Sequence, residues 1–125
     1  MARVLLVEDD ADLRAELADA LTLFDHEVVE AANAVHGLQL METVRIDVVV
    51  ADHRMPDITG IDMIRKMRER PELVSIPVVM VSAVSPSLPE DPHLCPSVFM
   101  TKPPDIERLN ETIESLLFED PEAQD

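Results

Sequence analysis

The feature that most constrains this chain is a run of β-branched residues that ends in one carboxylate. Residues 48–51 read Val-Val-Val-Ala, Asp52 follows directly, and Met55-Pro56 then breaks the pattern. An apolar strand without polar alternation is usually buried on both faces, as in a parallel sheet. Proline lacks an amide hydrogen and disfavours helix in the residue before it. The stretch therefore predicts a central strand with Asp52 at its carboxyl end, where open α/β sheets place their ligands. Taken alone, it also fits an Asp52 that caps a helix or turn.

The rest of the chain alternates between strand and helix patterns. Short apolar runs predict further strands at residues 4–7, 27–31, 78–81 and 98–100. Helical periodicity begins after the capping candidates Asp10, Asn33 and Asp105, and a further helix is predicted from about Thr59 to Arg70. This alternation predicts βαβ units and a doubly wound parallel sheet covered on both faces. We expect one α/β domain over residues 1–118 and an acidic tail at 119–125.

Residues 84–97 interrupt the alternation. This segment carries Pro86, Pro89, Pro92 and Pro96 and has no clean helical period. A proline in a helix interior removes one donor and clashes with the preceding turn, at a cost of about 3 kcal/mol or more. We therefore expect an extended or turn-rich loop, with at most one short helical turn around residues 90–94.

Charge and composition narrow the class of partner and compartment. The formal net charge of −16 disfavours direct binding to nucleic acid or an anionic membrane, and favours cations near the surface. No apolar run approaches the ~20 residues of a membrane span, and the amino terminus has no signal-peptide organisation. The single cysteine, Cys95, belongs to no zinc pattern. These observations predict a soluble cytoplasmic protein without membrane insertion.

Four predicted strand ends carry side chains of complementary chemistry. The first strand is followed by Glu8 and Asp9, the third by Asp52, the fourth ends at Ser82 and the fifth is followed by Lys102. Because the carboxyl ends of parallel strands meet at one edge of a sheet, these groups are expected to converge. Three crowded carboxylates repel one another unless a cation lies among them. Mg²⁺ suits such a site, since it prefers oxygen ligands and keeps several waters.

The same groups suggest a reaction. A carboxylate beside Mg²⁺ can act as a nucleophile and form an acyl phosphate. A hydroxyl and an ammonium opposite it, here Ser82 and Lys102, would meet the oxygens of the transferred phosphoryl group. Lys102 is one of only two lysines in the chain, which argues against simple surface decoration. The predicted catalytic residues are therefore Asp52, Ser82 and Lys102.

Four short motifs carry a family resemblance. They are Val7-Glu8-Asp9-Asp10, Asp52-x-x-Met55-Pro56-x-x-x-Gly60, Ser82-Ala83 and Phe99-x-x-Lys102-Pro103. Together, and in this order, they resemble the signature of bacterial response-regulator receiver domains over residues 2–118. The resemblance implies a flavodoxin-like, five-stranded sheet of order 2-1-3-4-5. It also implies a sensor histidine kinase or phosphotransfer protein as phosphoryl donor, and a downstream protein target or an effector domain outside this chain.

The resemblance assigns metal and acceptor roles residue by residue. Asp52 matches the phosphoacceptor, which also contacts the metal. Asp9 matches the acid that binds Mg²⁺ directly, and Glu8 its neighbour that acts mostly through water. The backbone carbonyl of Arg54 matches a further protein ligand. Asp10 reads as a helix N-cap rather than a metal ligand.

The remaining motifs match the switch residues of the family. Ser82 matches the switch hydroxyl, Phe99 the switch aromatic and Lys102 the phosphate-contacting lysine. The Lys102-Pro103 bond resembles one that is cis in the family. From the residues alone, Ser82 also reads as a turn former and Phe99 as a core residue. A receiver of this kind is not a dedicated enzyme, because it catalyses only its own phosphotransfer and dephosphorylation.

Three functions compete. The first is a phosphorylation switch that reshapes a protein-binding surface. The second is a receiver-like interaction module that acts without phosphorylation, suggested because the family's fourth helix is replaced by the proline-rich segment 84–97. The third is a hydrolase or a flavin protein, but Glu8, Asp9 and Asp10 would repel a phosphate after the first strand, and no general base beyond the acids is evident. Loss of the fourth helix also predicts that the usual family dimer is weak or absent.

Overall fold

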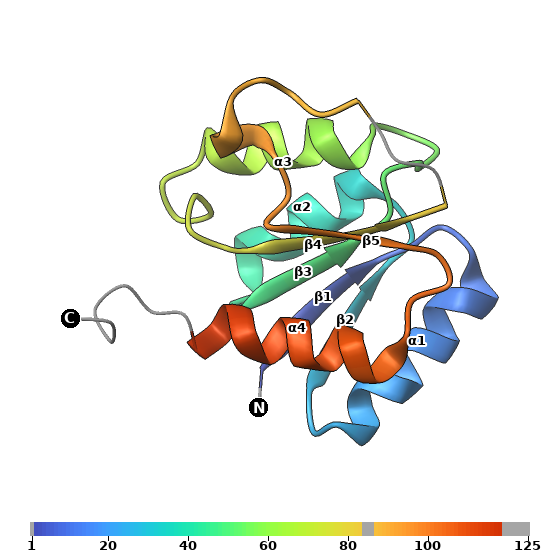
Figure 1. The fold of residues 1–125 in the computed structure, drawn as a ribbon. Helices are drawn as coiled ribbons and strands as arrows, with labels where there is room; N and C mark the ends of the chain where they lie inside the picture. The colour runs from blue at the N-terminus through green and yellow to red at the C-terminus, as the bar shows by residue number, and fades with distance from the viewer. Residues whose placement is uncertain (1, 84–86, 119–125) are drawn as a thin grey trace.

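Five parallel strands form a single sheet in the computed structural model, which describes residues 2–83 and 87–118. The strands are β1 (Arg3–Val7), β2 (Glu27–Ala31), β3 (Val48–Ala51), β4 (Val78–Ser82) and β5 (Val98–Thr101). Their spatial order is β2-β1-β3-β4-β5, so β3 lies at the centre (Figure 1). This confirms the doubly wound sheet and the strand order that the family resemblance implies.

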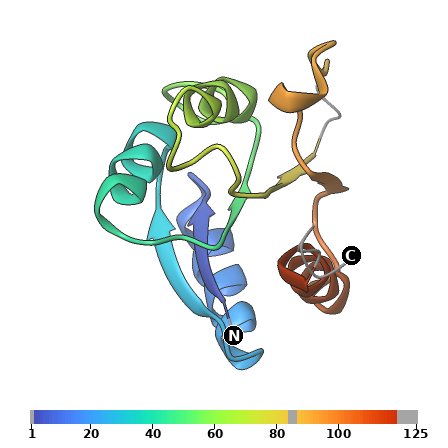
Figure 2. The same ribbon diagram turned by 90° about the vertical axis from the view of Figure 1, so that its left-hand side faces the viewer.

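The helices lie in two layers on opposite faces of the sheet (Figure 2). They are α1 (Ala11–Leu23), α2 (Ala34–Thr43), α3 (Gly60–Arg68) and α4 (Ile106–Phe118). One hydrophobic cluster joins α2 and α3 to one face, and a second joins α1 and α4 to the other. Alternate residues of β3 enter the two clusters, and all four are buried. The unbroken apolar run of this strand is thus explained by burial on both faces.

Helix starts follow the predicted capping residues. Asp10 accepts hydrogen bonds from the backbone amides of Asp12 and Leu13, which satisfies donors of the first turn of α1. Asn33 caps α2 and Asp105 accepts from the amide of Arg108. The helix predicted from about Thr59 to Arg70 is slightly shorter in the structure, where α3 ends at Arg68.

The segment after β4 contains no α-helix within its described residues 87–97. It forms one 3₁₀ turn, η1 (Pro92–Leu94), whose first residue follows the capping side chain of Asp91. The turn packs beside α3 (Figure 1). This confirms the expected replacement of a helix by a turn-rich loop for residues 87–97; residues 84–86 lie outside the described part of the chain.

One arginine fastens η1 to α3. Arg68 donates from Nε to the carbonyl of His93 at 3.2 Å. Its Nη1 also reaches three carbonyl oxygens of the α3–β4 connection, those of Leu73, Val74 and Ile76. The guanidinium therefore joins two loops to the last turn of the helix.

Among the described residues, no helix is long and apolar enough to cross a bilayer.

Candidate functional site

Backbone hydrogen bonds extend the strand ladder to the residues of the predicted site. The amide of Glu8 donates to the carbonyl of Ala31 at 3.0 Å, and the amide of Asp52 donates to that of Val7 at 3.2 Å. The amide of Lys102 donates to the carbonyl of Ser82 at 3.0 Å. The site residues thus stand on the rigid carboxyl edge of the sheet, as the positions of the apolar runs predicted.

Three carboxylates converge at this edge. Glu8, Asp9 and Asp52 each offer an oxygen, and these atoms lie within 4.8 Å of one another. Glu8 and Asp52 are only 2% and 7% exposed, whereas Asp9 is exposed. The cluster is therefore closed toward the core and open toward solvent at Asp9. An all-oxygen donor set with an open side fits Mg²⁺, which retains waters in its coordination shell.

Lys102 lies between the two buried acids. Its Nζ is 2.7 Å from Oε1 of Glu8 and 2.7 Å from Oδ2 of Asp52. Burial by itself lowers the pKa of Lys102, but its hydrogen bonds to Asp52 and Glu8 outweigh burial, and the pKa is raised. The ammonium therefore stays charged and is the one cation placed among these acids by the described residues.

For Glu8, this single cation does not offset the effect of burial. Burial raises the pKa of Glu8, and hydrogen bonds from Lys102 and the amide of Asp10 counteract only part of that rise. The buried Glu8 carboxylate is therefore a group that further positive charge nearby would stabilise. A divalent cation at the oxygen cluster would supply that charge.

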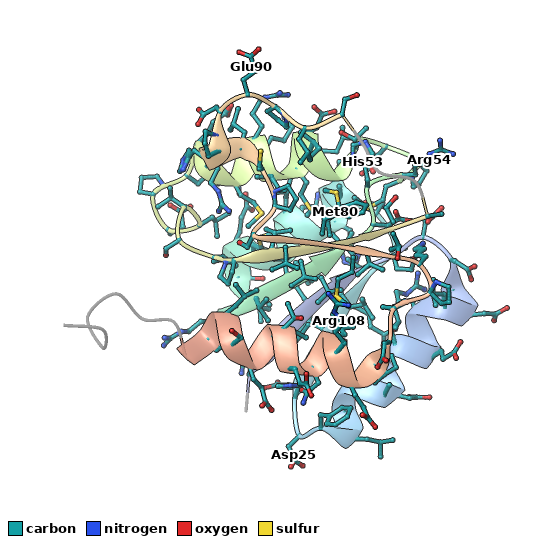
Figure 3. All side chains as sticks on the ribbon, in the orientation of Figure 1. Asp25, His53, Arg54, Met80, Glu90 and Arg108 are labelled. Atoms are coloured by element: carbon teal, nitrogen blue, oxygen red, sulfur yellow. The ribbon has the colours of Figure 1, made fainter. Side chains whose placement is uncertain are left out.

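The loop after Asp52 turns back tightly against the strand. The amide of Arg54 donates to Oδ1 of Asp52 at 3.2 Å, and the amide of Gly60 donates to the carbonyl of His53 at 2.8 Å. A Cβ on Gly60 would lie 2.8 Å from the Asp52 carbonyl oxygen and 2.9 Å from the methyl of Met80. Glycine is required here because α3 begins in direct contact with the strand end. The Arg54 side chain points away from the sheet (Figure 3).

The predicted switch residues lie at neighbouring strands. Ser82 is buried at the end of β4, and Phe99 on β5 is half-buried and packs against the cluster on the α2–α3 face. This position agrees with the reading of Phe99 as a core residue and leaves its switch role a prediction. The Lys102–Pro103 peptide bond is cis, as the resemblance implies.

Sequence reasoning missed two supporting residues. Arg14 donates from Nη1 to the backbone carbonyl of Glu8 at 2.7 Å and pairs with Glu30 of β2 at 3.6 Å. Asp57 accepts from the first amides of α2. Arg14 lies one helical turn after the capping residue Asp10, a spacing that places it over the β1–α1 loop. No sequence signal identifies the partner of Asp57.

Comparison with known proteins matches this arrangement. A family model described as "Response regulator receiver domain" matches residues 4–114. Protein PilH of Pseudomonas aeruginosa is 30% identical over 119 residues, covering 94% of this chain and 98% of PilH. Sensor histidine kinase TmoS of Ectopseudomonas mendocina is 36% identical over 81 residues, which are 65% of this chain but only 8% of the kinase.

Solved structures agree with the fold. The response regulator receiver domain protein (CheY-like) from Methanospirillum hungatei JF-1 superposes with a TM-score of 0.82 at 26% identity. The match covers 94% of each chain. The strand order, the acidic edge and the lysine therefore occur on a scaffold shared along nearly the full length.

Proposed function

The chain belongs to the response regulator receiver domain family of two-component systems, and on this premise we propose that Asp52 accepts a phosphoryl group in a Mg²⁺-dependent reaction. The observation that carries the proposal is the position of Lys102. Its ammonium lies 2.7 Å from Asp52, inside a cluster of acids at the sheet edge. A purely structural acid would not need a charged partner and an open acidic side together.

The transfer itself needs only positioned charge. An oxygen of the Asp52 carboxylate attacks the phosphorus of a phosphohistidine on a sensor kinase or phosphotransfer protein. The bond from phosphorus to the imidazole nitrogen breaks, and the imidazole keeps the bonding pair. The product is an acyl phosphate on Asp52. The Lys102 ammonium, which now bonds to Asp52 and Glu8, would then bond to a phosphoryl oxygen.

The acidic cluster supplies the proposed metal ligands. Glu8, Asp9, Asp52 and the backbone carbonyl of Arg54 would hold Mg²⁺, with Glu8 acting mostly through water. When bound, the ion offsets negative charge on the phosphoryl oxygens. Lys102 supplies the positive charge that belongs to the protein itself, and its ion pair with Asp52 orients the acceptor carboxylate.

The proposed output is a changed protein-binding surface. The Ser82 hydroxyl would donate to a phosphoryl oxygen, and Phe99 on the neighbouring strand would follow its movement. The recipient is a downstream protein or an effector domain outside this chain. Return to the resting state is self-catalysed hydrolysis of the acyl phosphate, so we propose no separate enzymatic activity.

A second candidate function is binding without phosphorylation. It is favoured by the described residues 87–97, which form a 3₁₀ turn where the family has its fourth helix. One experiment on the intact chain distinguishes the two functions.

Intact-mass measurement after incubation with acetyl phosphate tests the proposal. The parent protein is expected to gain one phosphoryl group with Mg²⁺ and none in its absence. Asp52→Asn should gain none, whereas the control Asp62→Asn, an exposed acid paired with Arg65 on α3, should label like the parent. Equal labelling of Asp52→Asn would contradict the acceptor assignment. A folded parent that never labels would favour the second function.

A further inference from the structure

The loop that carries the proposed metal carbonyl is fixed at both ends but has few polar anchors between them. Its ends are held by the Arg54 amide on Asp52 and the Gly60 amide on the His53 carbonyl. Within residues 55–58, Met55 and Ile58 pack against the core. Among the described residues, the hydrogen bonds from this stretch to another segment are those of Asp57 alone.

Asp57 reaches the start of α2. Its Oδ2 accepts from the amide of Val35 at 2.7 Å, and its Oδ1 accepts from that of Ala34 at 3.3 Å. Asn33, the residue that caps the same helix, accepts from the amide of His36 at 2.8 Å. Two first-turn donors of α2 are thus satisfied from a different loop. Ala34 is fully buried, so the loop is attached to a rigid point of the core.

This contact closes a path, made of hydrogen bonds and short chain segments, that passes through Glu8 and Asp52. Just before α2, the carbonyl of Ala31 accepts from the amide of Glu8, and the carbonyl of Val7 accepts from the amide of Asp52. The path from Asp57 to the start of α2, to Ala31, to Glu8, and back through Asp52 to the loop is therefore continuous. The Asp57 carboxylate thus gives the loop that bears Arg54 a second connection to Glu8, besides the hydrogen bond between Asp52 and Val7.

We propose that Asp57 is a positioning residue for metal binding, which holds the Arg54 carbonyl in register with Glu8 and Asp9 without touching the ion. This inference rests on the proposed function, because it assumes that Mg²⁺ binds at the acidic cluster. Outer groups that orient metal ligands commonly matter for affinity although they make no contact with the metal. The competing interpretation is that Asp57 only stabilises the first turn of α2.

A matched pair of variants separates these readings. Asp57→Ala removes the cap that comes from the loop, and Asn33→Ala removes the cap that belongs to the helix itself. For each we would measure the Mg²⁺ dissociation constant by calorimetry, urea unfolding, and amide exchange of residues 53–58 without metal. Asp57→Ala should raise the dissociation constant about tenfold, whereas Asn33→Ala should raise it by less than about twofold. Asp57→Asn keeps one acceptor oxygen and should fall between.

Exchange gives an answer that does not depend on the metal. Faster exchange of residues 53–58 in Asp57→Ala, but not in Asn33→Ala, is the expected result. Equal changes in both variants, or no change in either, would overturn the positioning role. A parent that binds no Mg²⁺ would instead contradict the proposed function, and the exchange comparison would still decide whether Asp57 fixes the loop.

Discussion

The segments that follow the neighbouring strands β3 and β4 leave the same edge of the sheet but differ in structure. The loop from Asp52 to Gly60 is short, closes on itself, and leads directly into α3. The segment after Ser82 carries four prolines and, in its described residues, one 3₁₀ turn. The first is bonded to the site residues themselves; the second is bonded to α3 through Arg68.

The difference shows which parts of the molecule the site depends on. Among the described residues, the backbone carbonyl of Ser82 is held by the amide of Lys102, the residue after β5. The chain after Ser82 can therefore lose its helix without moving the carboxylates or the lysine. The first loop has no such freedom, because a single Cβ on Gly60 would press on the Asp52 backbone.

Metal and lysine substitutions give the largest expected effects at the fixed edge. Asp9→Ala removes a proposed ligand and should weaken Mg²⁺ binding by at least about tenfold, since even outer-shell changes reach that size. Lys102→Ala deletes a positive charge beside Glu8 and Asp52, so Mg²⁺ should bind as well or better. Its phosphorylated form should instead fail to switch. Mg²⁺ titrations that do not distinguish the two variants would contradict this division of roles.

Gly60→Ala tests the rigidity of the first loop. The new Cβ would meet the Asp52 carbonyl oxygen at 2.8 Å, and overpacking of this kind costs about 1–3 kcal/mol of unfolding free energy. The control is Gly37→Ala within α2, where the nearest atom is a Val7 methyl at 3.1 Å. At that position the helix preference for alanine over glycine contributes roughly 0.5–1 kcal/mol, which offsets part of the cost of the contact. Urea unfolding should rank Gly60→Ala clearly below Gly37→Ala, and the reverse ranking would refute the close-contact account.

Arg68→Ala tests the attachment of the second segment. Losing the hydrogen bonds to four carbonyl groups should lower the free energy of unfolding by about 1–2 kcal/mol. The loss is small for four bonds because water can replace the guanidinium at these carbonyl groups. Exchange of residues 91–95 should rise, while that of residues 53–60 stays unchanged. Arg65→Ala, which removes an exposed pair with Asp62, should cost about 0.5 kcal/mol or less. Equal acceleration in both loops would show that the two segments are not independent.

The smallest expected effect is a pH dependence at Asp57. Burial tends to raise the pKa of this acid, but backbone hydrogen bonds from Val35, Ile58 and Ala34 lower it below the ordinary value of 3.8. An acid whose pKa is lower in the folded state contributes stability that is fully present above its unfolded-state pKa, and this stability is lost as pH falls through the folded-state pKa. The stability difference between the parent and Asp57→Asn should therefore be constant from about pH 7 to about pH 5 and shrink below. A difference that grows on acidification would contradict the assigned contacts.

Much of the site was predictable because its residues lie at the ends of short apolar runs. Glu8, Asp52, Ser82 and Lys102 all stand at or just beyond such runs, and parallel strand ends share one edge. The proline count likewise predicted the missing helix. In both cases the information is local: a strand pattern, or an amide that proline lacks.

What the sequence does not contain is the contact between distant loops. Asp57 reads as a turn residue, and Arg68 as a basic residue in the last turn of a helix. Their partners are backbone amides and carbonyls, which every residue carries, so no side-chain pattern marks them. The partly buried His53, whose Nδ1 has no partner in the described residues, is a further feature that its loop position did not indicate.

Chemical trapping of the phosphorylated residue identifies the phosphoacceptor directly. Borohydride reduces an acyl phosphate to the alcohol and releases phosphate, which converts a phosphorylated aspartate to homoserine. After reaction with acetyl phosphate and Mg²⁺, peptide mapping should place homoserine at position 52 and leave Asp9, Asp10 and Asp57 as aspartate. Homoserine at another aspartate, or trapping at position 52 that is equally complete without Mg²⁺, would contradict Mg²⁺-dependent phosphorylation of Asp52.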